Sequence, residues 1–319
     1  EMPTPSIGQP DELIIEVEAC GVCGTDLQIL ATPPGHPASP GTILGHEFVG
    51  RIVETGSSVS QVSVGDRVII DTDPKCGVCD PCRTGRPADC EGVVAIGIFR
   101  DGALASHVVA PASAAYPISG EVPAAIAALA EPLACVVNAG RRAALRAGES
   151  AVILGAGAIG CLFLALFRAS GAETLIVVEP NPERAAVARA MGADAVVAPD
   201  DLKNTLVERL PGGAEVVVDA VGSLFGTAIE AAARGGRIVL FGMNANARPA
   251  IHQVEITERS LTVMGSYISN FTYPEAIRLL ESGRLDLAPM ISAVMPLAQV
   301  TEGLDRLQSG SATKVVITP

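Results

Sequence analysis

Residues Gly155–Gly160 constrain the fold more than any other stretch of the sequence. They fit the pattern G-x-G-x-x-G, with glycines at Gly155, Gly157 and Gly160, between an apolar run and an alanine- and leucine-rich segment. In such a strand–turn–helix unit the glycines permit a tight turn, close approach of a pyrophosphate and close helix–strand packing. The free N–H groups at the helix N-terminus favour phosphate. The stretch predicts a dinucleotide-binding turn, and a glycine-rich turn without a ligand is the alternative.

Strands and helices alternate around this turn. Predicted strands are Ala151–Leu154, Leu175–Glu179, Ala195–Val197, Glu215–Asp219 and Arg237–Phe241. Predicted helices are Ala124–Ala130, Leu133–Ala144, Ala158–Ala169, Pro182–Met191, Leu202–Leu210 and Leu224–Ala233. Strands separated by helices imply a parallel, doubly wound α/β sheet.

The chain before and after this region has a different texture. The first third is predicted to be mostly β, with strands at Leu13–Val17, Phe48–Val53 and Asp66–Ile70 and two loops that contain cysteines. After Tyr267 we expect one helix, Pro274–Glu281, and a closing strand, Lys314–Thr318. We therefore divide the chain into a mostly-β domain (1–132), a doubly wound domain (133–267) and a return segment (268–319) that completes the first domain.

Four of the eight cysteines form a cluster with the spacing C-x2-C-x2-C-x7-C. They are Cys76, Cys79, Cys82 and Cys90. Four thiolates at this spacing can surround one tetrahedral Zn²⁺ and leave no open position, which predicts a structural zinc site. A reduced cluster without metal, or a disulfide pair, is the alternative. A nucleic-acid-binding zinc ribbon is disfavoured because the net charge is −13 and such a field repels phosphate.

A second candidate metal site combines the segment Cys20–Asp26 with Gly45-His46-Glu47. A thiolate, an imidazole and carboxylate oxygens suit Zn²⁺, and three protein ligands with one open position make a catalytic site. The alternative is a buried structural cysteine beside an unrelated surface histidine.

Length and composition limit the class of protein. A chain of 319 residues with 49% hydrophobic residues is long enough for two domains, each with its own core. We find no apolar stretch of membrane-spanning length and no secretory signal at the start. We therefore expect a cytoplasmic protein that binds neither membranes nor nucleic acid.

Taken together, the motifs resemble those of the zinc-dependent medium-chain dehydrogenases, and the resemblance covers nearly the whole chain. It rests on Gly21–Asp26, Gly45–Glu47, Gly65–Val68, the four clustered cysteines, Glu131–Ala134 and Gly155–Gly160, in the order of that family. The element Glu-Pro-Leu-Ala is most similar to the polyol (sorbitol-type) and threonine dehydrogenase branch. The resemblance implies a GroES-like catalytic domain and a Rossmann domain, with the active site in the cleft between them.

The resemblance also implies roles for individual residues of the catalytic centre. The implied ligands of a catalytic zinc are Cys23, His46, Glu47 and Glu131, where Glu131 binds the metal or its water. Asp26 is expected to orient His46, and Thr25 to bond the substrate hydroxyl. Gln28 departs from the pattern, because many relatives have a proton-relaying histidine there. Cys20 is an additional thiol that family register excludes as a ligand.

The cofactor is expected to be NAD. Glu179 ends the strand after the glycine turn, where a carboxylate can bond both ribose hydroxyls and would repel a 2′-phosphate. The resemblance implies that Arg184 packs on the adenosine and that Lys314 contacts the pyrophosphate. It also implies that Ile159, Cys135 and Val221 lie close to the nicotinamide. Cys161 is expected to serve only packing.

We therefore expect an NAD-dependent enzyme with one catalytic and one structural zinc that oxidises a secondary alcohol, such as a polyol or cyclitol, to a ketone. A homodimer or homotetramer is expected. The alternatives are a biosynthetic ketone or iminium reductase of the same family, and a catalytically silent protein that binds zinc and a dinucleotide.

Overall fold

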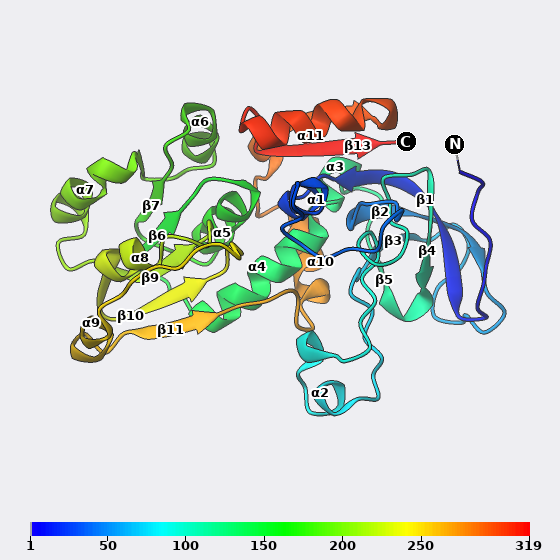
Figure 1. Ribbon diagram of the computed structural model, residues 1–319, viewed down its shortest axis with the longest axis horizontal. Coiled ribbons are helices and arrows are strands. Elements are labelled where there is room, and N and C mark those ends of the chain that lie inside the picture. Colours follow the sequence, from blue (N-terminus) through cyan, green and yellow to red (C-terminus); the bar gives the residue numbers. More distant parts are fainter. Residues whose placement is uncertain (1) are drawn as a thin grey trace. The chain divides into compact units, whose positions relative to one another are not determined.

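The computed structural model describes residues 2–319, and Figure 1 traces the chain. The chain forms two compact units, of which the first runs to Ala134 and also contains Ser269–Gly283 and Ile291–Pro319. The second contains Cys135–Ile268 and Arg284–Met290. The predicted return segment 268–319 therefore does not belong entirely to the first unit. Its part Arg284–Met290 belongs to the second unit, where the turn Ala288–Met290 packs against a helix. Among the described residues, no helix has the length and apolarity needed to cross a membrane.

A seven-stranded sheet organises the first unit, in the order β12-β13-β1-β2-β3-β5, with β4 paired to β1. Its strands are β1 (Glu12–Gly21), β2 (Glu47–Thr55), β3 (Arg67–Ile70), β4 (His107–Pro111), β5 (Ala115–Pro117), β12 (Ile291–Pro296) and β13 (Lys314–Thr318). Alternate residues of β1, Leu13, Ile15 and Val17, enter a core that includes Phe48 of β2. β1 pairs with β4 along its first half, with β13 at its end and with β2 throughout.

The helices of the first unit are short. They are α1 (Gly24–Leu30), α2 (Asp80–Arg83), α3 (Ala124–Ala127), α10 (Tyr273–Glu281) and α11 (Val300–Ser309). The helix α4 (Ala130–Ala143) begins in this unit and continues in the second.

The end of β1 is shaped by a buried ion pair. Lys314 of β13 and Glu47 of β2 are 1% and 2% exposed. The Lys314 ammonium donates one hydrogen bond to the Glu47 carboxylate and another, of 3.0 Å, to the carbonyl of Val22. Gly21 lies between them, and a Cβ there would collide with both side chains. Burial alone lowers the pKa of Lys314, but the negative charges of Glu47, Cys23 and Glu131 and the hydrogen bond to Glu47 together outweigh burial and raise it above its usual value. Glycine at position 21 therefore makes room for the pair.

The second unit contains a six-stranded sheet in the order β11-β10-β9-β6-β7-β8, and every pairing in it is parallel. Its strands are β6 (Ala151–Leu154), β7 (Leu175–Val178), β8 (Ala195–Val197), β9 (Ala214–Asp219), β10 (Ala232–Leu240) and β11 (Thr262–Gly265). Its helices besides α4 are α5 (Ala158–Ala169), α6 (Pro182–Ala190), α7 (Leu202–Arg209), α8 (Phe225–Ala231) and α9 (Gln253–Glu258). Strands β6 and β7 are fully buried, as expected when helices cover both faces of a parallel sheet.

The parallel register brings five strand ends to one edge of this sheet. Leu154 of β6 pairs with Val178 of β7 and Asp219 of β9, and Leu240 of β10 pairs with Asp219 and with Gly265 of β11. Strand order reverses between β6 and β9, and ligands of open α/β sheets bind outside the carboxyl ends of the strands at such a point. The loops that follow these five residues are therefore the candidate ligand-binding edge.

Two sequence-based expectations about elements were wrong. The region around Cys23 is the start of helix α1 rather than a loop, because the Cys23 Sγ accepts the N–H of Thr25 and the Asp26 carboxylate accepts the N–H of Cys23. These two bonds form a capping box. The C-terminal region also contains β12 and α11 in addition to the predicted helix and strand. Gly303 is unfavourable in a helix and weakened the helical signal of α11 in the sequence. Its lack of a side chain lets that helix approach Val315 of β13.

Replacing Lys314 with methionine tests the buried pair. Methionine fills a similar volume but leaves the Glu47 carboxylate buried without its cation, and removing one partner of a buried pair costs about 3–5 kcal/mol. We expect a corresponding fall in the urea midpoint of unfolding. The control is Arg306→Met, which removes the exposed pair of Arg306 with Glu302 and should cost about 1 kcal/mol or less. Equal losses in the two variants would contradict a stabilising role for the buried pair.

Candidate functional site

Three of the predicted catalytic residues come together in the first unit. Cys23, His46 and Glu47 offer a sulfur, a ring nitrogen and a carboxylate oxygen that lie within 4.8 Å of one another. Cys23 follows β1 at the cap of α1, and Glu47 begins β2. Pairing of Gly21 with Glu47 in the β1–β2 ladder brings the two segments together.

The backbone around His46 is held by close packing. Gly45 has a φ of +102°, and a Cβ there would lie 2.6 Å from the Leu104 nitrogen and 2.8 Å from the Cys20 Sγ. The carbonyl of Gly45 accepts the N–H of Ala103 at 2.9 Å. Only glycine fits this conformation and this space. The packing at Gly45 therefore fixes the backbone from which the His46 imidazole extends.

Asp26 faces the imidazole of His46. Its Oδ1 lies 3.5 Å from the His46 Nδ1, and neither atom has a hydrogen-bond partner among the described residues. Burial lowers the pKa of His46, but the negative charges of Cys23, Asp26 and Glu131 outweigh burial and raise it well above its usual value. A carboxylate next to Nδ1 favours the proton on that nitrogen and leaves the lone pair of Nε2 to bind a metal. This is the arrangement found around metal-binding histidines.

This group fits a zinc ion. A thiolate, an imidazole and a carboxylate are the donors that zinc takes in catalytic sites with three protein ligands. The excess negative charge that raises the His46 pKa is what a bound divalent cation would neutralise. The predicted fourth ligand, Glu131, is outside the cluster of ligand atoms, although its charge acts on both His46 and Lys314.

The position of Lys314 contradicts its predicted contact with a pyrophosphate. Its ammonium is buried in the first unit and is engaged by Glu47 and the Val22 carbonyl. The same contact shows that Glu47 has a cationic partner besides any metal. Cys20 lies in the core and donates its S–H to the Gly21 carbonyl, so it is not part of the ligand group.

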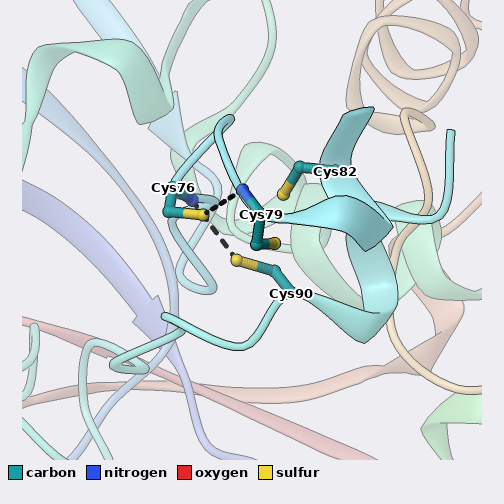
Figure 2. Close-up of side chains that lie close together, drawn as sticks. All are labelled: Cys76, Cys79, Cys82 and Cys90. Atoms are coloured by element: carbon teal, nitrogen blue, oxygen red, sulfur yellow. Dashed lines mark hydrogen bonds between the residues drawn. The ribbon is translucent and has the colours of Figure 1, made fainter. Parts of the chain in front are cut away.

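The four clustered cysteines form a second candidate metal site in the first unit. Figure 2 shows the side chains of Cys76, Cys79, Cys82 and Cys90 pointing toward one another, and their sulfurs lie within 4.8 Å. All four are free thiols. The N–H groups of Val78 and Cys79 stabilise the Cys76 thiolate and lower its pKa to about 6. Four converging sulfurs, one of them readily ionised, fit a closed tetrahedral zinc site.

The glycine turn has the predicted strand–turn–helix context in the second unit. Gly155 has a φ of +98°, and a Cβ there would lie 2.7 Å from the Val221 Cγ2. A Cβ at Gly160 would collide with the Gly155 carbonyl, whereas the space beside Gly157 is open. Gly157 caps α5, and no side chain bonds to the cap. The turn is thus packed tightly at Gly155 and Gly160 and accessible at Gly157, as a phosphate-binding turn requires.

The Glu179 carboxylate lies at the same edge of the sheet and is 7% exposed. Its Oε2 accepts the N–H of Ala156 at 2.7 Å, and its Oε1 accepts the N–H of Asn181 at 2.9 Å. The carboxylate therefore ties the glycine turn to the end of β7. Each oxygen retains a lone pair for a further donor such as a ribose hydroxyl.

The remaining predicted cofactor residues also belong to the second unit. Arg184 is half-buried on α6, and its Nε is buried without a hydrogen-bond partner among residues 2–319. Ile159 is half-buried on α5, Cys135 is buried on α4, and Val221 is 44% exposed after β9. Cys161 donates its S–H to the Ala156 carbonyl, and burial raises its pKa to about 12, as expected of a packing residue.

Asp219 is not among the site residues predicted from the sequence. This residue ends β9 at the candidate ligand-binding edge, and its carboxylate accepts three backbone N–H groups of the loop that follows. The available signal was an acidic residue at the end of a predicted strand, three residues before Gly222.

Comparison with known proteins gives the family. Residues 9–120 match the model of the alcohol dehydrogenase GroES-like domain, and residues 158–282 match that of the zinc-binding dehydrogenases. An L-threonine 3-dehydrogenase of Caldanaerobacter subterraneus is 32% identical, over 99% of this chain and 93% of the relative. A D-altritol 5-dehydrogenase of Agrobacterium fabrum is also 32% identical, over 96% and 92%.

Solved structures agree with this result. A Sinorhizobium meliloti 1021 protein described as a zinc-binding dehydrogenase, bound to NADP, is 33% identical with a TM-score of 0.93, over 100% of this chain and 94% of the other. A short chain alcohol dehydrogenase of E. coli CFT073 complexed with NADH is 26% identical with a TM-score of 0.90, over 100% and 94%. The predicted GroES-like and Rossmann folds are thus confirmed, and the chain belongs to the zinc-binding medium-chain alcohol dehydrogenases, in the polyol and threonine dehydrogenase branch.

Proposed function

We propose that this chain oxidises a secondary alcohol of a polyol, cyclitol or similar small metabolite to a ketone and passes the hydride to NAD. The observation that carries the proposal is the group of half-buried Cys23 and buried His46 and Glu47, with Asp26 facing the imidazole. The names of the relatives support an internal carbon as the reacting centre, since one is a 3-dehydrogenase and another a 5-dehydrogenase.

The proposal includes two zinc ions in different roles. Cys23, His46 and Glu47 would hold a catalytic zinc, which supplies a Lewis acid that makes the alcohol hydroxyl more acidic. The four clustered cysteines would hold a structural zinc that stabilises a loop with little core of its own. Lys314 offsets part of the negative charge of the catalytic group, because its ammonium lies against Glu47.

The protein residues around the catalytic group position the substrate and move its proton. Asp26 holds the imidazole of His46 in one orientation. We assign to Thr25 the hydrogen bond that the substrate hydroxyl donates. A threonine hydroxyl must pass a received proton onward, and the Gln28 amide cannot titrate as a histidine does. Water or Glu131 is the acceptor we propose at the end of this route.

The preference for NAD over NADP is proposed from Glu179. Both NADP-bound and NADH-bound structures occur among the similar proteins. Membership of the family therefore does not decide which of the two cofactors this chain prefers. A carboxylate at the end of β7 bonds ribose hydroxyls and repels a 2′-phosphate. A cytoplasmic location, supported by eight cysteines that form no disulfide among the described residues, and a homodimer or homotetramer complete the proposal.

Zinc-loaded protein incubated with NAD and a panel of secondary alcohols, including polyols, cyclitols and threonine, should produce NADH with at least one member. Cys23→Ala should abolish this turnover and lower the zinc content by about one ion per chain, because one of three ligands is lost. Zinc is measured by atomic emission and folding by circular dichroism.

The matched variant is Cys79→Ala, which should instead lower the unfolding midpoint, since the structural site contributes to folding. Cys23→Ala protein that keeps both its zinc and its activity would contradict the assignment of the catalytic group. Wild-type protein that binds zinc and dinucleotide but turns over no alcohol or ketone would favour the silent binding protein.

Glu179→Ala should relax the choice of cofactor. We expect the ratio of kcat/KM for NAD to that for NADP to fall by roughly tenfold, because the negative charge facing the 2′-position is lost. Glu179→Gln is the control for shape, since it removes the charge and keeps the length. Side-by-side kinetics with both cofactors give the ratio, and a wild-type enzyme that prefers NADP would be the contrary result.

Thr25→Ala should lower kcat/KM by at least about 100-fold, the lower range for loss of a group that assists proton transfer. Gln28→Ala should change it by less than about threefold, because its amide carries no proton in the proposed route. Steady-state rates between pH 6 and pH 10 test both variants. A loss in Gln28→Ala as large as in Thr25→Ala would mean that Gln28 contacts the substrate or takes part in the relay.

A further inference from the structure

Asp219 carries a buried carboxylate that forms no ion pair with any described residue. It ends β9, is 2% exposed and pairs with Leu154 of β6 and Leu240 of β10 in the centre of the parallel sheet. No salt bridge to Asp219 is present within residues 2–319. Burial of an unpaired carboxylate is costly unless hydrogen bonds satisfy its oxygens. The structure therefore has to supply donors at this point.

Three backbone N–H groups of the following loop supply them. The Asp219 Oδ1 accepts from Val221 at 2.9 Å and from Gly222 at 2.8 Å, and its Oδ2 accepts from Leu224 at 2.9 Å. The Asp219 carbonyl accepts the N–H groups of Phe241 and Gly242, at 3.0 and 2.9 Å. One residue thus holds the loop after β9 and the end of β10, through bonds strengthened by the charge of the carboxylate.

This loop is fixed by close packing as well. Gly222 has a φ of +88°, and a Cβ there would lie 2.5 Å from the Gly242 carbonyl. The Val221 side chain lies against Gly155, where a Cβ would be 2.7 Å from its Cγ2. Val221 is nevertheless 44% exposed. The Asp219 carboxylate therefore presents a fixed apolar side chain beside the first glycine of the cofactor turn.

We propose that Asp219 is a positioning residue for the nicotinamide half of the dinucleotide, acting through Val221; this inference rests on the proposed function. Sheets of this type consist of two mononucleotide-binding halves that meet at the reversal of strand order, here between β6 and β9. The glycine turn and Glu179 belong to the half that contains β6 and β7. Asp219 and Val221 belong to the other half, so their effect is expected on the part of the ligand that lies beyond the adenosine.

The test compares ligands that occupy one half or both halves. Asp219→Asn keeps the shape but turns one acceptor oxygen into an NH₂ donor that faces a backbone N–H. We expect the Kd for NAD to rise at least about tenfold, equivalent to about 1.4 kcal/mol, and the Kd for AMP to stay within about twofold. Isothermal titration calorimetry of zinc-loaded protein gives both constants, and the KM for NAD should rise more than kcat falls.

The matched control is Glu215→Gln at the opposite end of the same strand. The Glu215 Oε2 accepts the N–H and the hydroxyl of Ser150, at 2.9 and 2.5 Å, so its loss should lower stability and leave both Kd values unchanged. Equal changes in the Kd for NAD and AMP in Asp219→Asn, or none in either, would overturn the positioning role and make Asp219 a structural residue.

A second variant covers the case in which Asp219→Asn does not fold. Val221→Ala removes two methyl groups from a side chain that is 44% exposed, and it should weaken the binding of NAD but not that of AMP. Unchanged NAD affinity in Val221→Ala would overturn the inference, because the loop would then not touch the ligand. Wild-type protein that binds neither NAD nor NADP would overturn the proposed function, and the inference with it. Wild-type binding together with unaffected variants would overturn the inference alone.

Discussion

The contact between Glu47 and Lys314 across Gly21 is the constraint around which the first unit is arranged. It joins β2 and β13, which are far apart in the sequence, across the end of β1. A side chain at Gly21 would prevent it, and the register of β1 places Cys23 just beyond it. The buried charge pair and the candidate zinc ligands therefore depend on one glycine and on two antiparallel ladders.

The second unit depends on a different constraint, the common register of its parallel strands. Because β6, β7 and β9 end level with one another, the glycine turn, Glu179 and Asp219 all lie at one edge. Both carboxylates are buried and both accept backbone N–H groups of neighbouring loops. These carboxylates thus order the loops of this edge, and loops that are ordered in advance lower the entropic cost of binding a ligand.

Local patterns predicted much of the fold. The strands Ala151–Leu154 and Lys314–Thr318 and the helix Ala158–Ala169 have the predicted bounds, because each is a short, strongly apolar or helix-favouring run between clear turn signals. Two helices were missed because part of their sequence argues against a helix. The glycine in α11 is unfavourable for a helix but lets it pack against β13, and α1 forms because Cys23, a candidate zinc ligand, also caps the helix.

The sequence alone determined the candidate chemistry, because cysteine spacing, Gly-His-Glu and G-x-G-x-x-G are local patterns whose donors are known from residue type. Only the tertiary structure decided what each charged side chain contacts. Lys314 could be read from the sequence as a free cation for a pyrophosphate, yet β13 buries it against Glu47. Asp219 carried no evident role until the register of β9 and β10 surrounded it with backbone donors. The partners of a buried charge come from distant strands, so its role depends on packing that no local pattern records.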